Sequence, residues 1–323
     1  MTAGAQTLPE VSVITPAWKS AAFIGRAIAS VIAQESVRWE MVIVDDASPD
    51  DSTHAAILKA AAGDPRIVYD RLPENGGPSA ARNRAIALSR APYIAVLDDD
   101  DTMEPNRLAV LRDAAIRHEA DIVVDNMLAI RPGVSAMAEK RFLDLPQETV
   151  DALPITLETY IDPRTEIRFG ASLGYLKPLF RKDALLERQI SYDGTLRNSE
   201  DFYLIAELLA QDAKMILLPD ALYNYTIREG STSYRLSSDQ AAKILKADNR
   251  FREAYSSMWT SATRAASDRQ NRQRENACAF AYLVDAFKTR RPDRAASLFI
   301  TRPKSAPHMT RELLRIAGEK LFA

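Results

Sequence analysis

Cysteine and histidine are scarce in this chain of 323 residues. Cys278 is the single cysteine, and the three histidines, His54, His118 and His308, lie far apart in the sequence. One cysteine cannot form an internal disulfide, which suits a reducing compartment. Scattered histidines argue against a zinc site built from several imidazoles. We therefore expect neither structural disulfides nor a histidine-rich metal centre.

Long apolar runs are also missing. No stretch approaches the roughly 20 apolar residues that a membrane-spanning helix needs. The first ten residues, MTAGAQTLPE, have neither a basic start nor an apolar segment, so they do not resemble a signal peptide. We expect a cytoplasmic protein that is soluble or bound peripherally at the inner face of the cell membrane.

The charge of the chain is nearly balanced overall but unevenly distributed. The formal net charge is −2, yet from Asp239 to the end 17 Lys and Arg face 9 Asp and Glu, a net of +8 that leaves −10 for the rest. An acidic body suits a metal or another cation, and a basic C-terminal region suits an anionic partner.

Residues 11–130 alternate between two hydrophobic periodicities. Short β-branched runs predict strands at VSVIT, EMVIVD, RIVYDRL, YIAVLD and DIVVDNML. Helical spacing of apolar residues predicts helices at 21–34, 52–62, 79–89 and 105–118. Strands that alternate with helices indicate an α/β fold, with a mostly parallel sheet covered by helices on both faces.

The rest of the chain predicts two further regions. Residues 131–235 are less regular, as expected of a segment that builds the wall of a binding site. From residue 236 the pattern is helical, with helices expected at 239–256, about 260–289 and 308–321. TRRPDR and TRPKSAPH separate the later ones. We therefore divide the chain into 1–130, 131–235 and 236–323.

Polar clusters follow three of the predicted strands. They are PAWK at 16–19, DDAS at 45–48 and DDDD at 98–101, and ENGGPSAARN at 74–83 leads into a predicted helix. In open α/β sheets, ligands bind beyond the carboxyl ends of the strands. We therefore expect these four segments to meet at one edge of the sheet.

The run of four aspartates has two interpretations. The residues can be a solvated loop that caps the following helix. Alternatively, a hard cation such as Mg²⁺ or Mn²⁺ neutralises them and keeps positions open for substrate phosphates. The other polar segments at the same edge favour the second interpretation.

The other segments also allow two interpretations each. Asp45 and Asp46 can form an Asx turn, or one of them can accept hydrogen bonds from a base or a ribose. Arg82 can be a surface residue or can bind a phosphate or base. Trp18, which follows Pro16 at a strand end, can belong to the core or stack on a nucleobase.

The segment NSED at 198–201 is a second acidic site. Its simplest interpretation is a helix start, with Asn198 as the N-cap and acidic residues in the first turn. A general base can occupy the same place, because the positive end of a helix favours an ionised carboxylate.

Taken together and in this order, VSVITPAWK, VDDASPDDS, NGGPSAARN, LDDDD and NSEDF resemble the family 2 glycosyltransferases with the GT-A fold. Within that family, the chain is most similar to bacterial exopolysaccharide enzymes of the succinoglycan type. The resemblance spans about residues 10–235, and a basic helical region follows it.

The resemblance implies a role for each matched residue. Asp46 would accept a hydrogen bond from the uracil of a UDP-sugar, and Arg82 would assist at the nucleotide. Asp98 and Asp100 would form the acid-x-acid motif, with Asp100 on the metal directly and Asp98 shared between the metal site and the ribose.

The acceptor side is implied in the same way. Asp201 would be the catalytic base, and Glu200 would shape the acceptor site beside it. The segment REGSTS at 228–233 matches a family segment that closes over the diphosphate, which makes Arg228 and Ser231 further nucleotide-binding candidates.

Three residues depart from the family pattern. Trp18 stands where tyrosine is usual and Lys19 where asparagine is common. Ala47 replaces a common glycine, which is tolerable if the turn does not need a positive φ.

The implied reaction is a metal-dependent, inverting transfer of a hexose. UDP-glucose is the expected donor, Mg²⁺ or Mn²⁺ the cofactor, and a hydroxyl of a growing, lipid-linked oligosaccharide the acceptor, giving a β-linkage. Two alternatives stay open, a nucleotidyltransferase and a non-catalytic nucleotide-sugar-binding relative. Sparse aromatic residues argue against nucleic acid as a partner of the basic region.

The basic C-terminal region has two interpretations of its own. Its arginines stand beside six apolar residues, namely Leu298, Phe299, Ile300, Leu313, Leu314 and Ile316. Such a segment can lie on an anionic bilayer, where lipid-linked acceptors are found. It can equally form a helical bundle or a dimer interface with solvated arginines.

Overall fold

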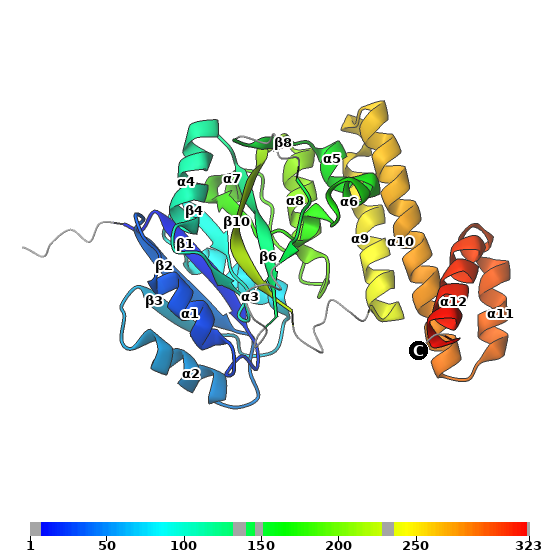
Figure 1. Ribbon diagram of the computed structural model, residues 1–323, viewed down its shortest axis with the longest axis horizontal. Coiled ribbons are helices and arrows are strands. Elements are labelled where there is room, and N and C mark those ends of the chain that lie inside the picture. Colours follow the sequence, from blue (N-terminus) through cyan, green and yellow to red (C-terminus); the bar gives the residue numbers. More distant parts are fainter. Residues whose placement is uncertain (1–7, 132–139, 146–150, 228–235, 322–323) are drawn as a thin grey trace, which may run out of the picture. The chain divides into compact units, whose positions relative to one another are not determined.

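The computed structural model describes residues 8–131, 140–145, 151–227 and 236–321. The chain divides into two compact units, Met1–Tyr160 with Arg164–Glu229, and Ile161–Pro163 with Gly230–Ala323. In the described residues the first unit contains the β-sheet and the second contains only helices (Figure 1). The two units are described separately below.

One mixed sheet forms the centre of the first unit. Its strands are β1 (Val11–Ala17), β2 (Trp39–Asp45), β3 (Ile67–Arg71), β4 (Tyr93–Val96), β5 (Thr102–Met103), β6 (Ile122–Ile130), β7 (Lys140–Arg141), β8 (Leu153–Ile155), β9 (Leu179–Arg181) and β10 (Met215–Thr226). Neighbouring strands follow the order β3-β2-β1-β4-β9-β6-β10-β5, with β7 beside β6 and β8 beside β10. The pairs β1–β2, β1–β4, β2–β3 and β6–β10 are parallel.

The central strands are buried on both faces. Every residue of β2 is buried, and so is every residue of β1 except Pro16. Runs of valine and isoleucine favour extended backbone and suit a sheet covered on both sides. The covering helices are α1 (Ile24–Ile32), α2 (Ser52–Ala61), α3 (Pro78–Leu88), α4 (Arg107–His118), α7 (Lys182–Glu187) and α8 (Glu200–Ala210) (Figure 1). The predicted α/β architecture of residues 11–130 is thus confirmed.

A buried ion pair joins α4 to the sheet. The side chains of Arg107 and Asp125 are both 0% exposed. Arg107 donates to both carboxylate oxygens of Asp125 and, at 2.6 Å, to the carbonyl oxygen of Lys177. Its guanidinium also lies 4.9 Å from the ring of Tyr223. One side chain of α4 therefore holds β6, β10 and the segment before β9 in register.

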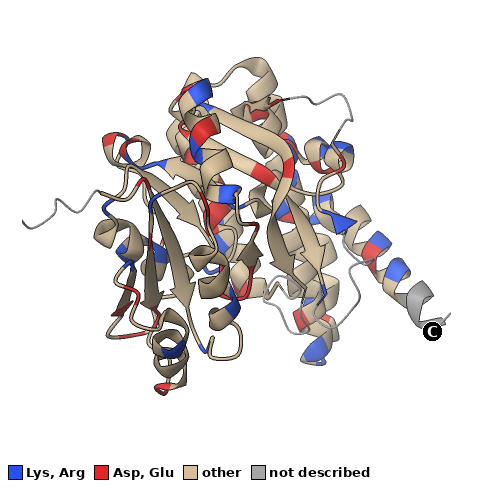
Figure 2. Ribbon diagram, turned by 60° about the vertical axis from the view of Figure 1, so that its left-hand side comes forward, with Lys and Arg blue, Asp and Glu red and all other residues tan. Residues whose placement is uncertain are grey.

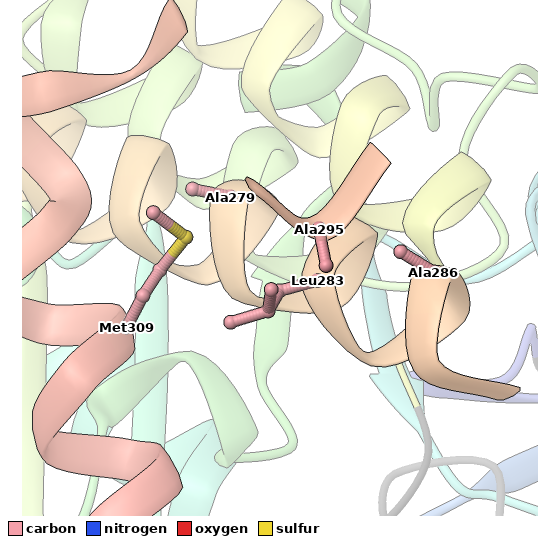
Figure 3. Close-up of a cluster of buried hydrophobic side chains, with 5 residues drawn as sticks. All are labelled: Ala279, Leu283, Ala286, Ala295 and Met309. Atoms are coloured by element: carbon pink, nitrogen blue, oxygen red, sulfur yellow. The ribbon is translucent and has the colours of Figure 1, made fainter. Parts of the chain in front are cut away.

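The second unit is a set of helices with its own core. Its main helices are α9 (Ser238–Tyr255), α10 (Ser261–Lys288), α11 (Pro292–Thr301) and α12 (Ala306–Leu321). A cluster of buried side chains joins α10, α11 and α12, and it consists of Ala279, Leu283, Ala286, Ala295 and Met309 (Figure 3). We did not expect α11, because its sequence lies among prolines and arginines. Pro292 stands in its first turn, where a missing N–H costs nothing.

Five of the six apolar residues named in the basic region separate into two groups, and the sixth, Ile316, is partly buried. Leu298, Phe299 and Leu313 pack against the cluster of buried side chains. Ile300 and Leu314 are 80% and 69% exposed. Packing within the second unit thus buries only some of the apolar residues of the basic region and leaves Ile300 and Leu314 in contact with solvent. No helix in the described parts of the chain is long and apolar enough to cross a membrane.

Candidate active site

The polar segments after β1, β2 and β4 meet at one edge of the sheet. Because β1 pairs in parallel with both β2 and β4, their carboxyl ends lie side by side. The backbone N–H of Asp46 donates to the carbonyl of Ala17 at 2.8 Å, and that of Leu97 donates to Ile14 at 3.1 Å. The predicted convergence of sequence-distant aspartates therefore follows from strand order.

The first of the four aspartates, Asp98, is held between two cations. Its Oδ1 accepts from Arg82 Nη2 at 2.8 Å, and its Oδ2 lies 2.8 Å from Lys177 Nζ. Burial favours the neutral acid, but the charges of Lys177 and Arg82 outweigh burial and hold the pKa of Asp98 well below its usual range. Asp98 is thus an ionised carboxylate inside the site.

Asp99 and Asp101, in the same run, have other hydrogen-bond partners. Asp99 accepts from Ser20 Oγ, and burial, with repulsion from its acidic neighbours, raises its pKa to about 6. Asp101 accepts from Tyr223 Oη and the N–H of Thr226, and burial raises its pKa to about 8. Burial favours the protonated form of Asp101, and the cations beside Asp98 neutralise its charge, so that repulsion within the run is reduced.

Asp100 lies between Asp99 and Asp101 in the chain and is partly exposed at the edge of the sheet. Its carbonyl oxygen accepts from Arg26 Nη2 at 3.2 Å, which fixes the turn of the chain at this point. The described residues contain no cluster of three His, Cys, Asp or Glu side chains that could hold a metal. A cation that also binds substrate phosphates needs only one or two protein carboxylates, and Asp100 suits that type of site.

Arg82 is a buried residue of α3 and not a surface arginine. Its side chain is 4% exposed, and its guanidinium contacts the segment after β4 and the start of α8. Nη1 lies 2.8 Å from Glu200 Oε1 and 3.6 Å from Asp201 Oδ1, while Nη2 contacts Asp98. Arg82 therefore links the aspartate run to the start of α8.

Lys177 completes this ionic cluster and was missed in the sequence. Its ammonium lies 2.8 Å from Asp98 Oδ2 and 3.2 Å from Asp201 Oδ2, and its side chain is 9% exposed. Burial alone favours the neutral amine, but Asp98 and Asp201 raise the pKa of Lys177 far above its ordinary value. The available signal was a lone lysine inside the apolar run LGYLKPLF.

Glu200 and Asp201 form the first turn of α8, and both are buried. The N-cap is Ser199 at φ 64°, and no side chain caps the helix, so the interpretation of Asn198 as N-cap is wrong. Burial, together with the charge of Asp201, raises the pKa of Glu200. Asp201 Oδ1 is buried without a hydrogen-bond partner among the described residues. Arg82 Nη1 lies 3.6 Å from that oxygen, and the Tyr192 hydroxyl also faces the Asp201 carboxylate.

Asp46 holds the glycine loop that precedes α3. It accepts from Asn75 Nδ2, Gly76 N and Gly77 N at 2.8, 2.7 and 2.8 Å. Burial raises its pKa, and the two glycine N–H groups oppose that shift. A carboxylate has about four acceptor sites. At most one is therefore left for a nucleobase.

Asp45 forms the Asx turn that its sequence indicated. Its Oδ1 accepts from the N–H of Ser48 at 2.9 Å. Ala47 within this turn has φ 53°, so the position does take the left-handed conformation that glycine adopts freely. Lys19, at φ 54°, also stands where a residue tolerant of this conformation is usual in the family. Both departures from the family pattern occur where the backbone is strained.

Trp18 is 49% exposed, which excludes the core interpretation. The ammonium of Lys19 lies 4.4 Å from the centroid of the Trp18 ring. The backbone N–H of Trp18 donates to Ser20 Oγ. Pro16 stands two residues earlier in β1. Arg228 and Ser231 lie outside the described residues.

Gly76 offers a direct test of the loop that Asp46 holds. A Cβ at Gly76 would lie 2.7 Å from Ala80 Cβ, so Gly76→Ala must displace the loop or α3. We expect it to lower the free energy of unfolding by about 1–3 kcal/mol in chemical denaturation. Gly194→Ala is the matched control, because nothing lies within 4 Å of its added Cβ. Equal stability of the two variants would contradict the close packing of this loop.

The chain can now be compared with known proteins. A model of Glycosyl transferase family 2 matches residues 12–172. The chain is 35% identical over 306 residues to the succinoglycan biosynthesis protein ExoO of Rhizobium meliloti (strain 1021), which covers 94% of this chain and 84% of that protein. It belongs to glycosyl transferase family 2. ExoU of the same organism, another succinoglycan biosynthesis protein, is 35% identical over 280 residues, 79% of this chain and 78% of that protein.

Membership of the family confirms the resemblance seen in the sequence, and the chain is a glycosyltransferase. The alternatives of a nucleotidyltransferase and a non-catalytic relative are set aside. Solved structures agree on the GT-A fold. TarS 1–349 of S. aureus in complex with UDP-GlcNAc matches with a TM-score of 0.57 at 19% identity, over 90% of each chain. The mannosyltransferase PcManGT of Pyrobaculum calidifontis, in complex with GDP-Man and Mn²⁺, matches with a TM-score of 0.57 at 18% identity, over 98% of this chain and 88% of that one.

Proposed function

We propose that this glycosyltransferase transfers a hexose from a UDP-sugar, with UDP-glucose as the expected donor, to a hydroxyl of an exopolysaccharide precursor, with inversion to a β-linkage. The observation that carries the proposal is the ionic cluster in which Arg82 and Lys177 each contact both Asp98 and Asp201. This cluster sets the residues after β4, which would face the donor, beside the Asp201 carboxylate, whose Oδ1 accepts no hydrogen bond from the described residues. The identity to two succinoglycan biosynthesis proteins supports the exopolysaccharide assignment.

In this proposal the acidic groups have separate tasks. Asp201 removes the proton of the acceptor hydroxyl as its oxygen attacks the anomeric carbon from the face opposite the leaving group. Glu200, held by Arg82, shapes the acceptor side. Trp18, after Pro16, offers an exposed ring for a base. Asp46 supports the loop at Gly76 and Gly77.

A divalent metal ion would be held by Asp100, because Asp98 already has both oxygens on cations. When bound, such an ion neutralises the charge that develops on the leaving diphosphate. Asp98 would then face the ribose. The solved neighbours support this donor class indirectly, since TarS is in complex with UDP-GlcNAc and PcManGT with GDP-Man and Mn²⁺.

Titration calorimetry with UDP tests the donor and metal assignments together. We expect UDP to bind more tightly in the presence of Mn²⁺ than in its absence, and GDP to bind more weakly than UDP. Asp100→Ala should lose at least about tenfold in Mn²⁺-dependent affinity, roughly 1.4 kcal/mol. Asp113→Ala, which removes an exposed carboxylate of α4, is the matched control. If UDP does not bind even with Mn²⁺, or if Asp100→Ala binds as the native protein does, the assignment is wrong.

We further propose that the second unit contacts an anionic bilayer, where a lipid-linked acceptor would lie. Figure 2 shows Lys or Arg positions along α12, the helix that leads to the C-terminus. Six basic residues from 288 on have no ion-pair partner among the described residues, namely Lys288, Arg290, Arg294, Arg302, Lys304 and Arg311. Exposed Ile300 and Leu314 lie among them in sequence. Basic residues with scattered apolar ones favour binding to an anionic surface.

Vesicle sedimentation with and without phosphatidylglycerol tests this contact. Each basic residue near an anionic surface contributes about 1 kcal/mol. Reversing three charges, as in R290E/R294E/R311E, should therefore weaken binding to anionic vesicles by about 100-fold. The control reverses three exposed charges of the first unit, K59E/R117E/K140E. Equal binding of both triple variants would rule out the C-terminal helices as the contact.

A further inference from the structure

Lys177 is a buried lysine, and hydrogen bonds to neighbouring elements fix the backbone at this position. It lies between the 3₁₀ turn Leu173–Tyr175 and β9. Its carbonyl accepts from the buried Arg107 at 2.6 Å, and the next residue, Pro178, accepts from the N–H of Val96 at 3.0 Å. The backbone from which the ammonium projects is thus tied to α4 and β4 independently of the ionic cluster.

The two cations of the cluster do not share the carboxylates equally. Arg82 lies at 2.8 Å from both Asp98 and Glu200, but at 3.6 Å from Asp201. Lys177 donates to Asp201 Oδ2 at 3.2 Å. Within the described residues, Lys177 is therefore the cation hydrogen-bonded to Asp201.

This contact fixes one oxygen of the Asp201 carboxylate, Oδ2, by a hydrogen bond. With Oδ2 on Lys177, the other oxygen, Oδ1, lies 3.6 Å from Arg82 Nη1 and has no hydrogen-bond partner among the described residues. A buried ammonium is costly to desolvate, and Asp98 already has Arg82 as a partner. The additional effect of Lys177 is to orient Asp201 and tie it to Asp98.

We propose that Lys177 is the positioning residue for Asp201, an inference that rests on the proposed role of Asp201 as the base. Lys177 holds Oδ2, so that Oδ1 receives the proton. The acceptor oxygen bonds to the anomeric carbon, the bond from that carbon to the diphosphate oxygen breaks with its electron pair leaving on UDP, and the acceptor proton moves to Oδ1. The ammonium keeps its protons throughout.

The kinetic test measures UDP release from UDP-glucose in the presence of Mn²⁺. We expect Lys177→Ala to reduce kcat by about 100-fold, the cost of a misplaced catalytic group, while UDP affinity by calorimetry changes less than about threefold. Lys182→Met is the matched control, because Lys182 donates to the carbonyl of Ser89 and contacts no residue of the cluster. Ethylammonium should restore part of the lost rate in Lys177→Ala, and tetramethylammonium, which cannot donate a hydrogen bond, should not.

A double-variant cycle separates action through Asp201 from an independent effect. In an Asp201→Asn background, Lys177→Ala should cause less than about a threefold further loss, because residues that act as one unit are not additive. If the losses of kcat in Lys177→Ala and Asp201→Asn multiply in the double variant, the inference is wrong. It is also wrong if Lys177→Ala loses UDP affinity by the same factor as it loses rate. An inactive Asp201→Asn beside a fully active Lys177→Ala overturns this inference alone. A fully active Asp201→Asn removes the proposed base and the inference with it.

A spectroscopic readout needs no donor. In protein labelled with ¹⁵N-lysine, the buried ammonium should give a slowly exchanging signal that is absent from Lys177→Ala. The signal should shift in Asp201→Asn and stay in place in Lys182→Met. A signal that Asp201→Asn leaves unmoved would show that Lys177 does not hold Asp201 in solution, whichever sugar nucleotide the enzyme uses.

Discussion

Replacing Asp201 by asparagine should abolish most of the transfer activity and leave donor binding intact. Asparagine keeps the size of the side chain and can still accept from Lys177, so the buried cluster loses a base without losing its shape. General-base catalysis contributes typically 10²–10⁴-fold. We therefore expect kcat for UDP release from UDP-glucose to fall by about that factor.

The measurement separates binding from chemistry. UDP affinity in the presence of Mn²⁺ should change less than about threefold, since Asp201 acts on the acceptor and not on the nucleotide. Asp220→Asn, at an exposed carboxylate of β10, is the control for the substitution itself. A kcat above about a third of the native value would make Glu200, the neighbouring carboxylate on Arg82, the next candidate base.

The second large effect is expected at Arg107, away from the reacting groups. Arg107→Met leaves the carboxylate of Asp125 buried without its cation, and it also removes the donor to the carbonyl of Lys177. Burial already raises the pKa of Asp125, and Arg107 opposes that shift. Breaking a buried pair by removing one partner costs about 3–5 kcal/mol. The free energy of unfolding should fall by that amount in chemical denaturation.

Two comparisons sharpen this prediction. Arg117→Met removes an arginine that is 64% exposed and paired with Asp151, so it should cost less than about 1 kcal/mol. The double variant Arg107→Met with Asp125→Leu should recover part of the loss, because no unpaired charge is then buried. If Arg107→Met is as stable as Arg117→Met, the buried pair is not what holds α4 on β6.

Local patterns predicted the elements that surround the site. Runs such as MVIVD in β2 are short, rich in β-branched residues and followed by a polar segment. This local pattern predicts a buried strand without knowledge of the residues that pack against it. The helix α11 escaped the same reasoning. Pro292 breaks a helix in the interior but starts one in the first turn, and only the packing of Ala295 on the core of the second unit decides between these outcomes.

Local patterns could not assign partners inside the site. Asp46 reads as a base-binding residue, yet its hydrogen bonds hold Gly76 and Gly77. The motif implied a place for Asp98 between the metal site and the ribose, and it gave no sign that Arg82 and Lys177 lie against the two oxygens. Lys177 itself gave only the weak signal of a charge within an apolar run. Each of these contacts joins residues far apart in the chain, so no spacing in the sequence encodes them.

The sequence by itself determined the fold class, the family and the edge of the sheet at which the acidic segments gather. Those follow from hydrophobic period, from strand order and from an ordered set of motifs, which are properties of the chain read along its length. Tertiary structure alone decided how the four aspartates differ, because Asp98 faces cations while Asp101 is buried against Tyr223. A carboxylate takes its charge and its role from what surrounds it in space, and distant segments supply much of that environment, such as Ser20 for Asp99 and Tyr223 for Asp101.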